Sequence, residues 1–307
     1  MNASIYPISS RLESYGLPPV LIAASSEAAA RRAAETADGA ELPFVSIPLD
    51  AMLSRLDLQG SATAIWLELE DDGGPELDRI LDRIDAEAGA GRYPAVIAAP
   101  QSLVDPIVAR IRNSDIEVVL DGTPADRAAA LALARWRRSH RNRGVAEDIT
   151  QEPSAARLRQ LSDEVSRIAA SLARLSVGPD APAEKLHAPK GEAPSVSLDT
   201  VRQVIRSRRL RTRFFDEELF ADPAWDMLLD LLQAEIAQHR VPVSSLCIAA
   251  AVPATTALRW IKTMTDAGLF KRRADPHDGR RVFVELSPGA SDAMHRYFGE
   301  VGKAVAV

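Results

Sequence analysis

The chain has 307 residues, one cysteine (Cys247) and a formal net charge of −6. This length predicts two domains with connecting segments, and the lone cysteine excludes an intramolecular disulfide framework. No signal peptide is expected and no apolar run is long enough to span a bilayer, so we expect a cytoplasmic protein with no membrane partner. Residues 1–150 hold 15 basic and 23 acidic side chains, whereas residues 198–307 hold 16 and 14. The C-terminal end is therefore the better candidate for binding nucleic acid.

Short apolar runs alternate with helical segments through the first 141 residues. Strands are expected at 19–25, 44–49, 62–69, 94–100 and 116–122, and helices at 26–37, 50–58, 75–88, 102–113 and 124–141. Continuous apolar strands that alternate with helices indicate a parallel sheet covered on both faces. Ligands of such a sheet bind at the carboxyl ends of its strands.

The order and size of these five units resemble the receiver domains of two-component response regulators, over about residues 18–140. The resemblance implies a flavodoxin-like fold for residues 1–143. The family's phosphotransfer residues are replaced by Ala23, Ala24, Ser25 and Ser26 after the first strand, Ala98, Ala99 and Pro100 after the fourth, and Thr123 before Pro124. Without a carboxylate cluster for Mg²⁺, a transferring phosphoryl group has nothing to neutralise it. We therefore expect a pseudo-receiver that accepts no phosphate.

Glu68 is the residue nearest to the position of the family's phosphoacceptor. It either imitates a permanently charged acceptor or, the interpretation we favour, is a solvent-facing carboxylate at the end of a strand. No Gly-rich phosphate loop follows any expected strand, and the five histidines and one cysteine show no metal-ligand spacing. We expect no cofactor, no metal and no enzymatic activity, because no set of nucleophile, base and acid is found in the sequence.

A heptad pattern follows the predicted receiver-like domain. Its apolar residues are Leu158, Leu161, Val165, Ile168, Leu172 and Leu175, at alternating steps of three and four. This spacing predicts a dimerisation helix over residues 152–177, with packing on the receiver-like domain as the alternative. The prolines and glycines of residues 178–197 indicate a flexible linker.

Residues 198–307 are predicted to form an α+β domain. Six arginines lie on an amphipathic helix within 202–213, and Asp222 and Pro223 begin the next helix. Ser244 or Ser245 is expected to cap a short helix, and a further helix runs from Pro253 to Gly268. A strand from 269, a basic turn and an alternating strand at 281–287 complete a hairpin. Two helices followed by a basic ribbon are typical of a unit that reads a DNA duplex.

The helix from Pro253 has one apolar and one polar face. Ala257, Trp260, Ile261 and Met264 form the stripe expected to be buried. The candidate DNA contacts, from this helix, its neighbour and the hairpin, are Ser244, Ser245, Thr255, Thr256, Arg259, Lys262, Thr263, Arg272, Arg273, His277, Arg280 and Arg281. Hydroxyl groups permit close approach to base edges, and guanidinium groups bind guanine or phosphate. The alternative is an ordinary solvated helix and a plain β-turn.

The stretch GLFKRRADPHDGRRVFVELS resembles the wing of the MarR-type winged helix-turn-helix regulators. Asp275, Pro276, Asp278 and Arg280 occupy the matching places, and Ser287 replaces the usual threonine. The preceding TTALRWIKTMTDAGL is similar to the family's recognition helix, so the resemblance covers about residues 198–290. It implies base reading by Thr255, Thr256 and Arg259, and a minor-groove contact by Arg280.

These features together predict a dimeric, sequence-specific transcriptional regulator that binds double-stranded DNA at an inverted repeat. The recognition helix is expected in the major groove, and the wing on the minor groove or on phosphates. One alternative is a protein-interaction adaptor whose receiver-like domain is the functional module and meets a protein partner. Another is an active phosphorelay receiver.

Overall fold

The computed structural model describes residues 17–113, 115–143, 196–215 and 220–305. The described residues up to Ser139 and from 196 onward belong to one compact unit. The predicted dimerisation helix (152–177) and nearly all of the predicted linker (178–197) lie outside the described residues. Those two assignments, and the domain limits drawn from them, stay predictions.

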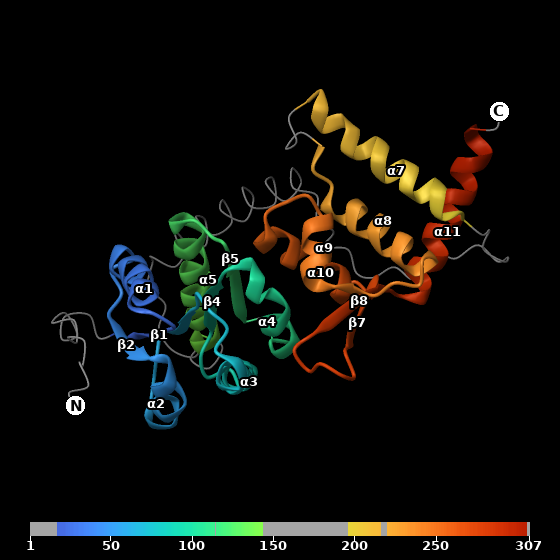
Figure 1. The fold of residues 1–307 in the computed structure, drawn as a ribbon. Helices are drawn as coiled ribbons and strands as arrows, with labels where there is room; N and C mark the ends of the chain where they lie inside the picture. Colours follow the sequence, from blue (N-terminus) through green and yellow to red (C-terminus); the bar gives the residue numbers. More distant parts are fainter. Residues whose placement is uncertain (1–16, 114, 144–195, 216–219, 306–307) are drawn as a thin grey trace. The chain divides into compact units, whose positions relative to one another are not determined.

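Residues 17–143, the α/β part, form a five-stranded parallel sheet with the strand order β2-β1-β3-β4-β5 (Figure 1). The strands are β1 (Val20–Ala24), β2 (Phe44–Pro48), β3 (Ala64–Glu68), β4 (Ala95–Ala99) and β5 (Ile116–Leu120). The helices are α1 (Glu27–Gly39), α2 (Met52–Leu58), α3 (Gly74–Gly89), α4 (Val104–Arg110) and α5 (Pro124–Arg143), with 3₁₀ turns η1 (Leu49–Ala51) and η2 (Gln101–Leu103). The predicted alternation of five strands and five helices is confirmed.

Apolar side chains cover both faces of this sheet, because successive residues of a strand point to opposite sides. Leu21, Ile65 and Ile97 pack with α2, α3 and α4 on one face. Ile22 and Trp66 pack with α1 and α5 on the other face. Each strand therefore reads as a continuous apolar run rather than an alternating one.

Residues 196–305, the winged helix part, combine helices with a small antiparallel sheet of order β6-β8-β7. The elements are α7 (Leu198–Leu210), η3 (Arg211–Arg213), α8 (Pro223–Ile236), β6 (Val241–Pro242), α9 (Val243–Ala249), α10 (Ala254–Asp266), β7 (Phe270–Ala274), β8 (Val282–Leu286) and α11 (Pro288–Val305). Asp222 caps α8 by accepting the N–H of Trp225 at 3.3 Å, as predicted. The predicted order of helices and hairpin strands is confirmed.

The pair α9 and α10 turns through 108°, as the two helices of a helix-turn-helix do. Gly268, at φ +74°, ends α10, and the N–H of Leu269 donates to the carbonyl of Met264 at 2.9 Å. The predicted serine cap of α9 is wrong. This helix begins at Val243 after Pro242, and no side chain caps it, because the fixed backbone of the proline already sets the helix entry. In the described part, no single helix meets the length and hydropathy needed to cross a bilayer, although α9 and α10 meet them as a bent pair.

The buried stripe of α10 holds the winged helix part together. Ala257, Ile261 and Met264 are buried as predicted, whereas Trp260 is only partly buried. Cys247 of α9 is buried, and burial raises the pKa of its thiol to about 12. A buried thiol that stays protonated is a structural residue and not a reactive one.

Candidate nucleic-acid interface

The outer face of α10 carries the polar side chains that the sequence places on a recognition helix. Thr256, Arg259, Lys262 and Thr263 are exposed. Thr263 donates its hydroxyl to the carbonyl of Arg259 at 2.9 Å, and Lys262 pairs with Asp266 at 2.7 Å. Short hydroxyl side chains beside two cations suit the approach of a helix to base edges and phosphates.

The hairpin β7–β8 is a tight turn with cations around it. Asp278 accepts the N–H of Arg280, and Asp275 accepts the N–H of His277, each at 2.9 Å. The two carboxylates therefore build the turn. Arg273 and Arg281 are exposed and pair with Glu285 (2.9 Å) and Asp278 (3.3 Å), both within the winged helix part.

Two of the candidate DNA contacts bind the α/β part through their hydroxyl groups. The N–H of Leu120, at the end of β5, donates to the hydroxyl oxygen of Thr255 at 2.9 Å, and that hydroxyl lies 3.3 Å from the carbonyl oxygen of Leu120. Ser244 donates its N–H (3.0 Å) and its hydroxyl (2.6 Å) to the carboxylate of Asp105 in α4. Neither contact is predicted by the sequence motifs.

Arg280 of the wing also binds the α/β part. Its guanidinium group lies 2.6 Å from Asp72 and 3.1 Å from Asp78, the latter in α3. Only 28% of the Arg280 side chain is exposed. The hydrogen bond from Arg280 lowers the pKa of Asp72 below its ordinary value, because the guanidinium group stabilises the ionised carboxylate.

Two further arginines meet carbonyl or carboxylate oxygens of the α/β part. Arg272 donates to the backbone carbonyl of Val108 in α4. Arg259 lies 3.6 Å from Glu117 of β5, and Glu117 also pairs with Arg137 at 2.5 Å. The Arg259 side chain remains 63% exposed, so this last contact is weak.

The twelve candidate residues therefore fall into two groups. Five contact the α/β part: Ser244, Thr255, Arg259, Arg272 and Arg280. The other seven are Ser245, Thr256, Lys262, Thr263, Arg273, His277 and Arg281, all of them exposed; Arg259 and Arg272 of the first group are exposed as well. Four of the first group lie where α9, α10 and the hairpin pack against α4 and β5, whereas Arg280 pairs with Asp72 and Asp78 at the start of α3.

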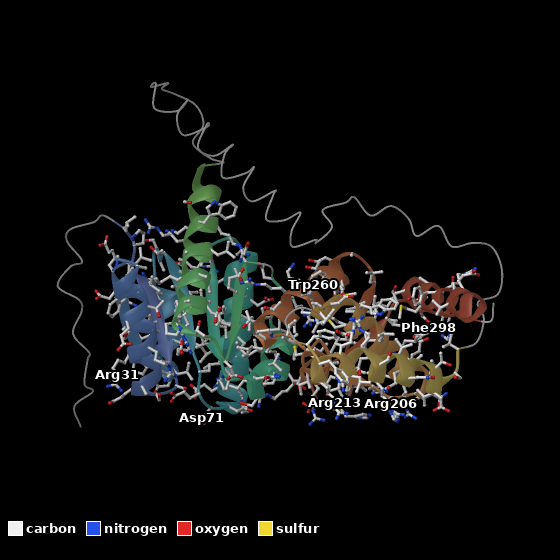
Figure 2. All side chains as sticks on the ribbon, turned by 90° about the horizontal axis from the view of Figure 1, so that it is seen from above. Arg31, Asp71, Arg206, Arg213, Trp260 and Phe298 are labelled. Carbon is white, nitrogen blue, oxygen red and sulfur yellow. The ribbon has the colours of Figure 1, made fainter. Side chains whose placement is uncertain are left out.

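The arginines around α7 only partly face solvent. Arg208 is turned inward and pairs with Asp226 of α8 at 2.6 Å. Arg202, Arg206 and Arg213 are exposed, and Figure 2 shows the last two pointing away from the ribbon. The amphipathic pattern predicts arginines that face outward; this holds for these three residues and for Arg209, and it is wrong for Arg208.

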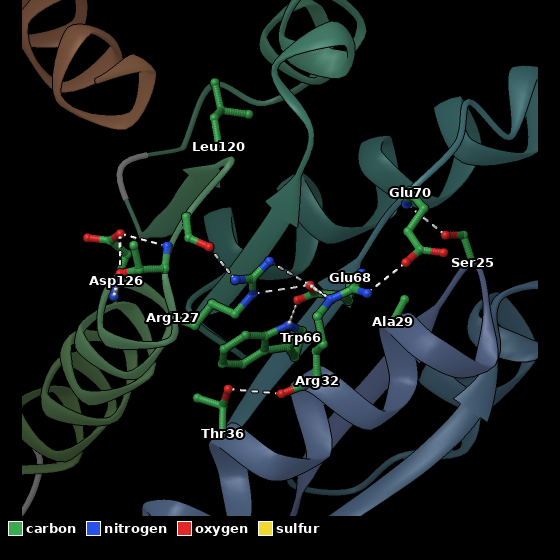
Figure 3. Close-up of polar contacts among 12 residues, drawn as sticks. Ser25, Ala29, Arg32, Thr36, Trp66, Glu68, Glu70, Leu120, Asp126 and Arg127 are labelled. Atoms are coloured by element: carbon green, nitrogen blue, oxygen red, sulfur yellow. Dashed lines mark hydrogen bonds and ion pairs between the residues drawn. The ribbon is translucent and has the colours of Figure 1, made fainter. Parts of the chain in front are cut away.

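The carboxyl end of β3, where the resemblance to receivers locates a phosphoacceptor, holds a closed ion-pair cluster (Figure 3). Glu68 is 1% exposed and lies 3.2 Å from Nε of Arg32, 3.0 Å from Nη2 of Arg127 and 2.9 Å from the indole N–H of Trp66. The favoured interpretation of Glu68 as a solvent-facing carboxylate is wrong. Arg32 and Arg127, from α1 and α5, neutralise the buried charge. Arg32 also pairs with Glu70 at 2.7 Å.

Comparison with known proteins identifies the C-terminal part. Residues 228–290 match a family model described as winged helix DNA-binding domain, and no curated protein matches the chain. Similar solved structures include the adhesin competence repressor of Streptococcus pyogenes, with 17% identity over 36% of this chain and 75% of that one and a TM-score of 0.21. BpsR of Bordetella bronchiseptica has 22% identity over 35% and 79%, with a TM-score of 0.21. The homodimeric winged helix-turn-helix domain of a possible ArsR-family regulator from Mycobacterium bovis has 14% identity over 36% and 91%, with a TM-score of 0.20. The predicted winged helix DNA-binding domain is confirmed by the family match.

The sequence motifs do not predict the acidic residues that contact the reading surface, by which we mean the face of the winged helix part that carries the twelve candidate DNA contacts. Asp72, Asp78, Asp105 and Glu117 are spread over four separate positions of the α/β part and form no motif. The one signal in the sequence was the excess of acidic side chains in residues 1–150.

Proposed function

We propose that this protein is a sequence-specific DNA-binding transcriptional regulator of the MarR-like type. The observation that carries the proposal is a winged helix DNA-binding domain at residues 228–290 whose recognition-helix and wing positions hold hydroxyl and guanidinium groups. In this proposal α10 enters the major groove, where Thr256 and Arg259 read bases. The wing, with Arg273, Arg280 and Arg281, lies on phosphates or in the minor groove.

A dimer completes the proposal. Residues 152–177 are proposed to pair two chains through their heptad positions, which gives two reading heads for an inverted repeat. The proposed location is the cytoplasm, where the DNA of a regulator of this type is found.

The α/β part is proposed to be a receiver-like domain without phosphotransfer. Its strand order, β2-β1-β3-β4-β5, is that of flavodoxin-like domains and supports this reading. Arg32 and Arg127 both pair with Glu68 at the carboxyl end of β3, so two cations already neutralise this carboxylate. Incubation with acetyl phosphate and Mg²⁺ should leave the intact mass unchanged. A gain of one phosphoryl group would reject this part of the proposal.

The direct test of DNA binding uses the full chain. Genomic fragments retained by the purified protein are sequenced, and a recovered duplex is titrated by fluorescence anisotropy at several salt concentrations. Arg281→Ala should weaken binding and reduce the slope of log affinity against log salt by about 1, because one phosphate contact is lost. Arg31→Ala, which removes the same charge from exposed α1, is the matched control and should change neither.

Base reading is tested separately. Thr256→Ala should lower the preference for the recovered duplex over an unrelated duplex more than it lowers affinity for the unrelated one. Equal losses on both duplexes would argue against base reading by α10. An Arg281→Ala protein with the wild-type salt slope would argue against the wing contact.

A protein-interaction adaptor is the second candidate, favoured by the apolar cluster in which Val243 and Ile261 of the winged helix part already pack with Val108 and Ile116 of the α/β part. Ionic strength separates the two functions. DNA binding falls steeply with salt, whereas an apolar protein contact does not.

A further inference from the structure

We propose that the α/β part is a built-in competitor of DNA. Its acidic edge, formed by Asp72, Asp78, Asp105 and Glu117 together with the free side of β5, binds the reading surface of the winged helix part and keeps the chain in a closed form. DNA binding then requires this contact to open. The proposal rests on the proposed function, since it names the partner that occupies the same surface.

The chemistry of the acidic edge matches that of a nucleic-acid backbone. Arg280 pairs with two carboxylates, at 2.6 Å and 3.1 Å, and Ser244 donates twice to a third. Charged oxygens with guanidinium and hydroxyl donors are the same pairs that a wing makes with phosphates. The resemblance to MarR-type wings implies that Arg280 contacts the minor groove of DNA. In the closed form, carboxylates of this chain pair with the same side chain.

The free side of β5 binds α10 through Thr255. β5 is the last strand in the sheet order, so one side of its backbone has no neighbouring strand. The hydroxyl of Thr255 lies against both the N–H (2.9 Å) and the carbonyl oxygen (3.3 Å) of Leu120. A single side chain thereby meets the backbone donor and acceptor that a further strand would otherwise pair with. A base edge cannot bond Thr255 while Leu120 holds it.

Apolar packing makes the contact more than a set of surface ion pairs. Val108 and Ile116 of the α/β part lie in the same continuous cluster as Val243 and Ile261 of the winged helix part. The packed elements are α4 against α9 and β8, and β5 against α10. Burial of apolar area supplies the attraction, and the charged pairs fix how the two surfaces meet.

Part of the winged helix surface remains accessible to DNA in the closed form. Thr256, Arg273 and Arg281 are exposed in it, so an approaching duplex meets part of the basic surface before the rest is free. Opening then exchanges carboxylates for phosphates at Arg280 and frees Thr255 for base contact. Apparent DNA affinity is reduced by the fraction of chains that are closed.

Charge removal on the acidic edge tests the competition. The variant Asp72→Asn/Asp78→Asn removes both carboxylates that pair with Arg280. The control, Asp71→Asn/Asp82→Asn, removes two charges from the same region: Asp71 is exposed and Asp82 pairs with Arg110. In anisotropy titrations with the recovered duplex, the first variant should bind about tenfold more tightly than the control, because two ion pairs no longer favour the closed form.

Hydrogen exchange at Leu120 reports opening without relying on affinity. Its N–H has the Thr255 hydroxyl as acceptor and belongs to the part of the chain that DNA is not expected to touch. Saturating duplex should therefore accelerate exchange of the peptide that ends β5. Thr255→Val, which keeps the shape and removes the hydroxyl, should accelerate the same exchange in the absence of DNA.

The outcomes separate this proposal from the function on which it rests. Equal affinity for the acidic-edge variant and its control, with Leu120 exchange unchanged by duplex, would overturn the proposal while DNA binding stands. Failure of all variants to bind any duplex would overturn the proposed function and, with it, DNA as the competitor. Tighter binding by the variant together with faster Leu120 exchange on adding duplex would support both.

Discussion

Replacement of Glu68 by alanine should destabilise the α/β part strongly. The carboxylate is 1% exposed and accepts from the guanidinium groups of Arg32 and Arg127 and from the indole of Trp66. The substitution leaves the buried Trp66 N–H without an acceptor, which costs about 1–3 kcal/mol. It also leaves Arg127, whose side chain is 15% exposed, without its carboxylate.

The larger of these losses, the broken buried ion pair, sets the expected magnitude. Removing one partner of a buried ion pair costs about 3–5 kcal/mol. Arg32 adds little, because its side chain is 38% exposed and keeps its pairing with Glu70 at 2.7 Å. We therefore expect Glu68→Ala to lower the free energy of unfolding by about 3–5 kcal/mol. Glu68→Gln keeps one acceptor oxygen and should cost about 1–3 kcal/mol.

Urea denaturation followed by far-UV circular dichroism measures the loss as a lower midpoint at unchanged slope. Glu70→Ala is the control, since that carboxylate lies near the surface at the same strand end and should shift the midpoint little. A loss of less than about 1 kcal/mol for Glu68→Ala would refute the reasoning, because it would mean that the carboxylate does not neutralise the two arginines.

Three further predictions concern the winged helix part. Burial raises the pKa of Asp230. The folded state therefore favours the neutral carboxyl group at low pH, and this contribution is lost as the pH rises through that pKa. Asp230→Asn should raise the free energy of unfolding at pH 7.5 by up to about 1 kcal/mol, and the gain in urea midpoint should vanish in acid. Cys247, with its pKa raised to about 12, should not react with Ellman's reagent at pH 8 until urea unfolds the chain. Gly268→Ala should lower the free energy of unfolding by about 1 kcal/mol, because Gly268 ends α10 at φ +74°; an unchanged urea midpoint would contradict this.

The sequence predicted the helices and strands because interactions between residues close together in the chain determine them. Apolar runs between turn residues gave all five strands of the sheet, since each strand is buried on both faces. Asp222 and Gly268 were assigned correctly as helix ends because their capping partners lie within a few residues. The hairpin was predicted for the same reason, as Asp275 and Asp278 bond the backbone two residues on.

Long-range partners were not predictable in this way. Glu68 reads as a solvated strand end in sequence, yet its two arginines come from positions 36 and 59 residues away. Ser244 reads as a helix cap, yet it donates to Asp105, 139 residues earlier in the chain. No spacing rule links such positions, because the fold alone brings them together.

The reading surface illustrates the difference between predicting a chemistry and predicting its partner. A motif with Thr255, Arg259 and Arg280 specifies hydroxyl and guanidinium donors on one face, and any array of anionic oxygens and free backbone groups satisfies them. DNA is one such array, and the acidic edge of the α/β part is another. The acidic excess of residues 1–150 against the basic balance of residues 198–307 therefore has two consequences. It disfavours DNA at the α/β part, and it favours that part as the partner of the winged helix surface whenever DNA is absent.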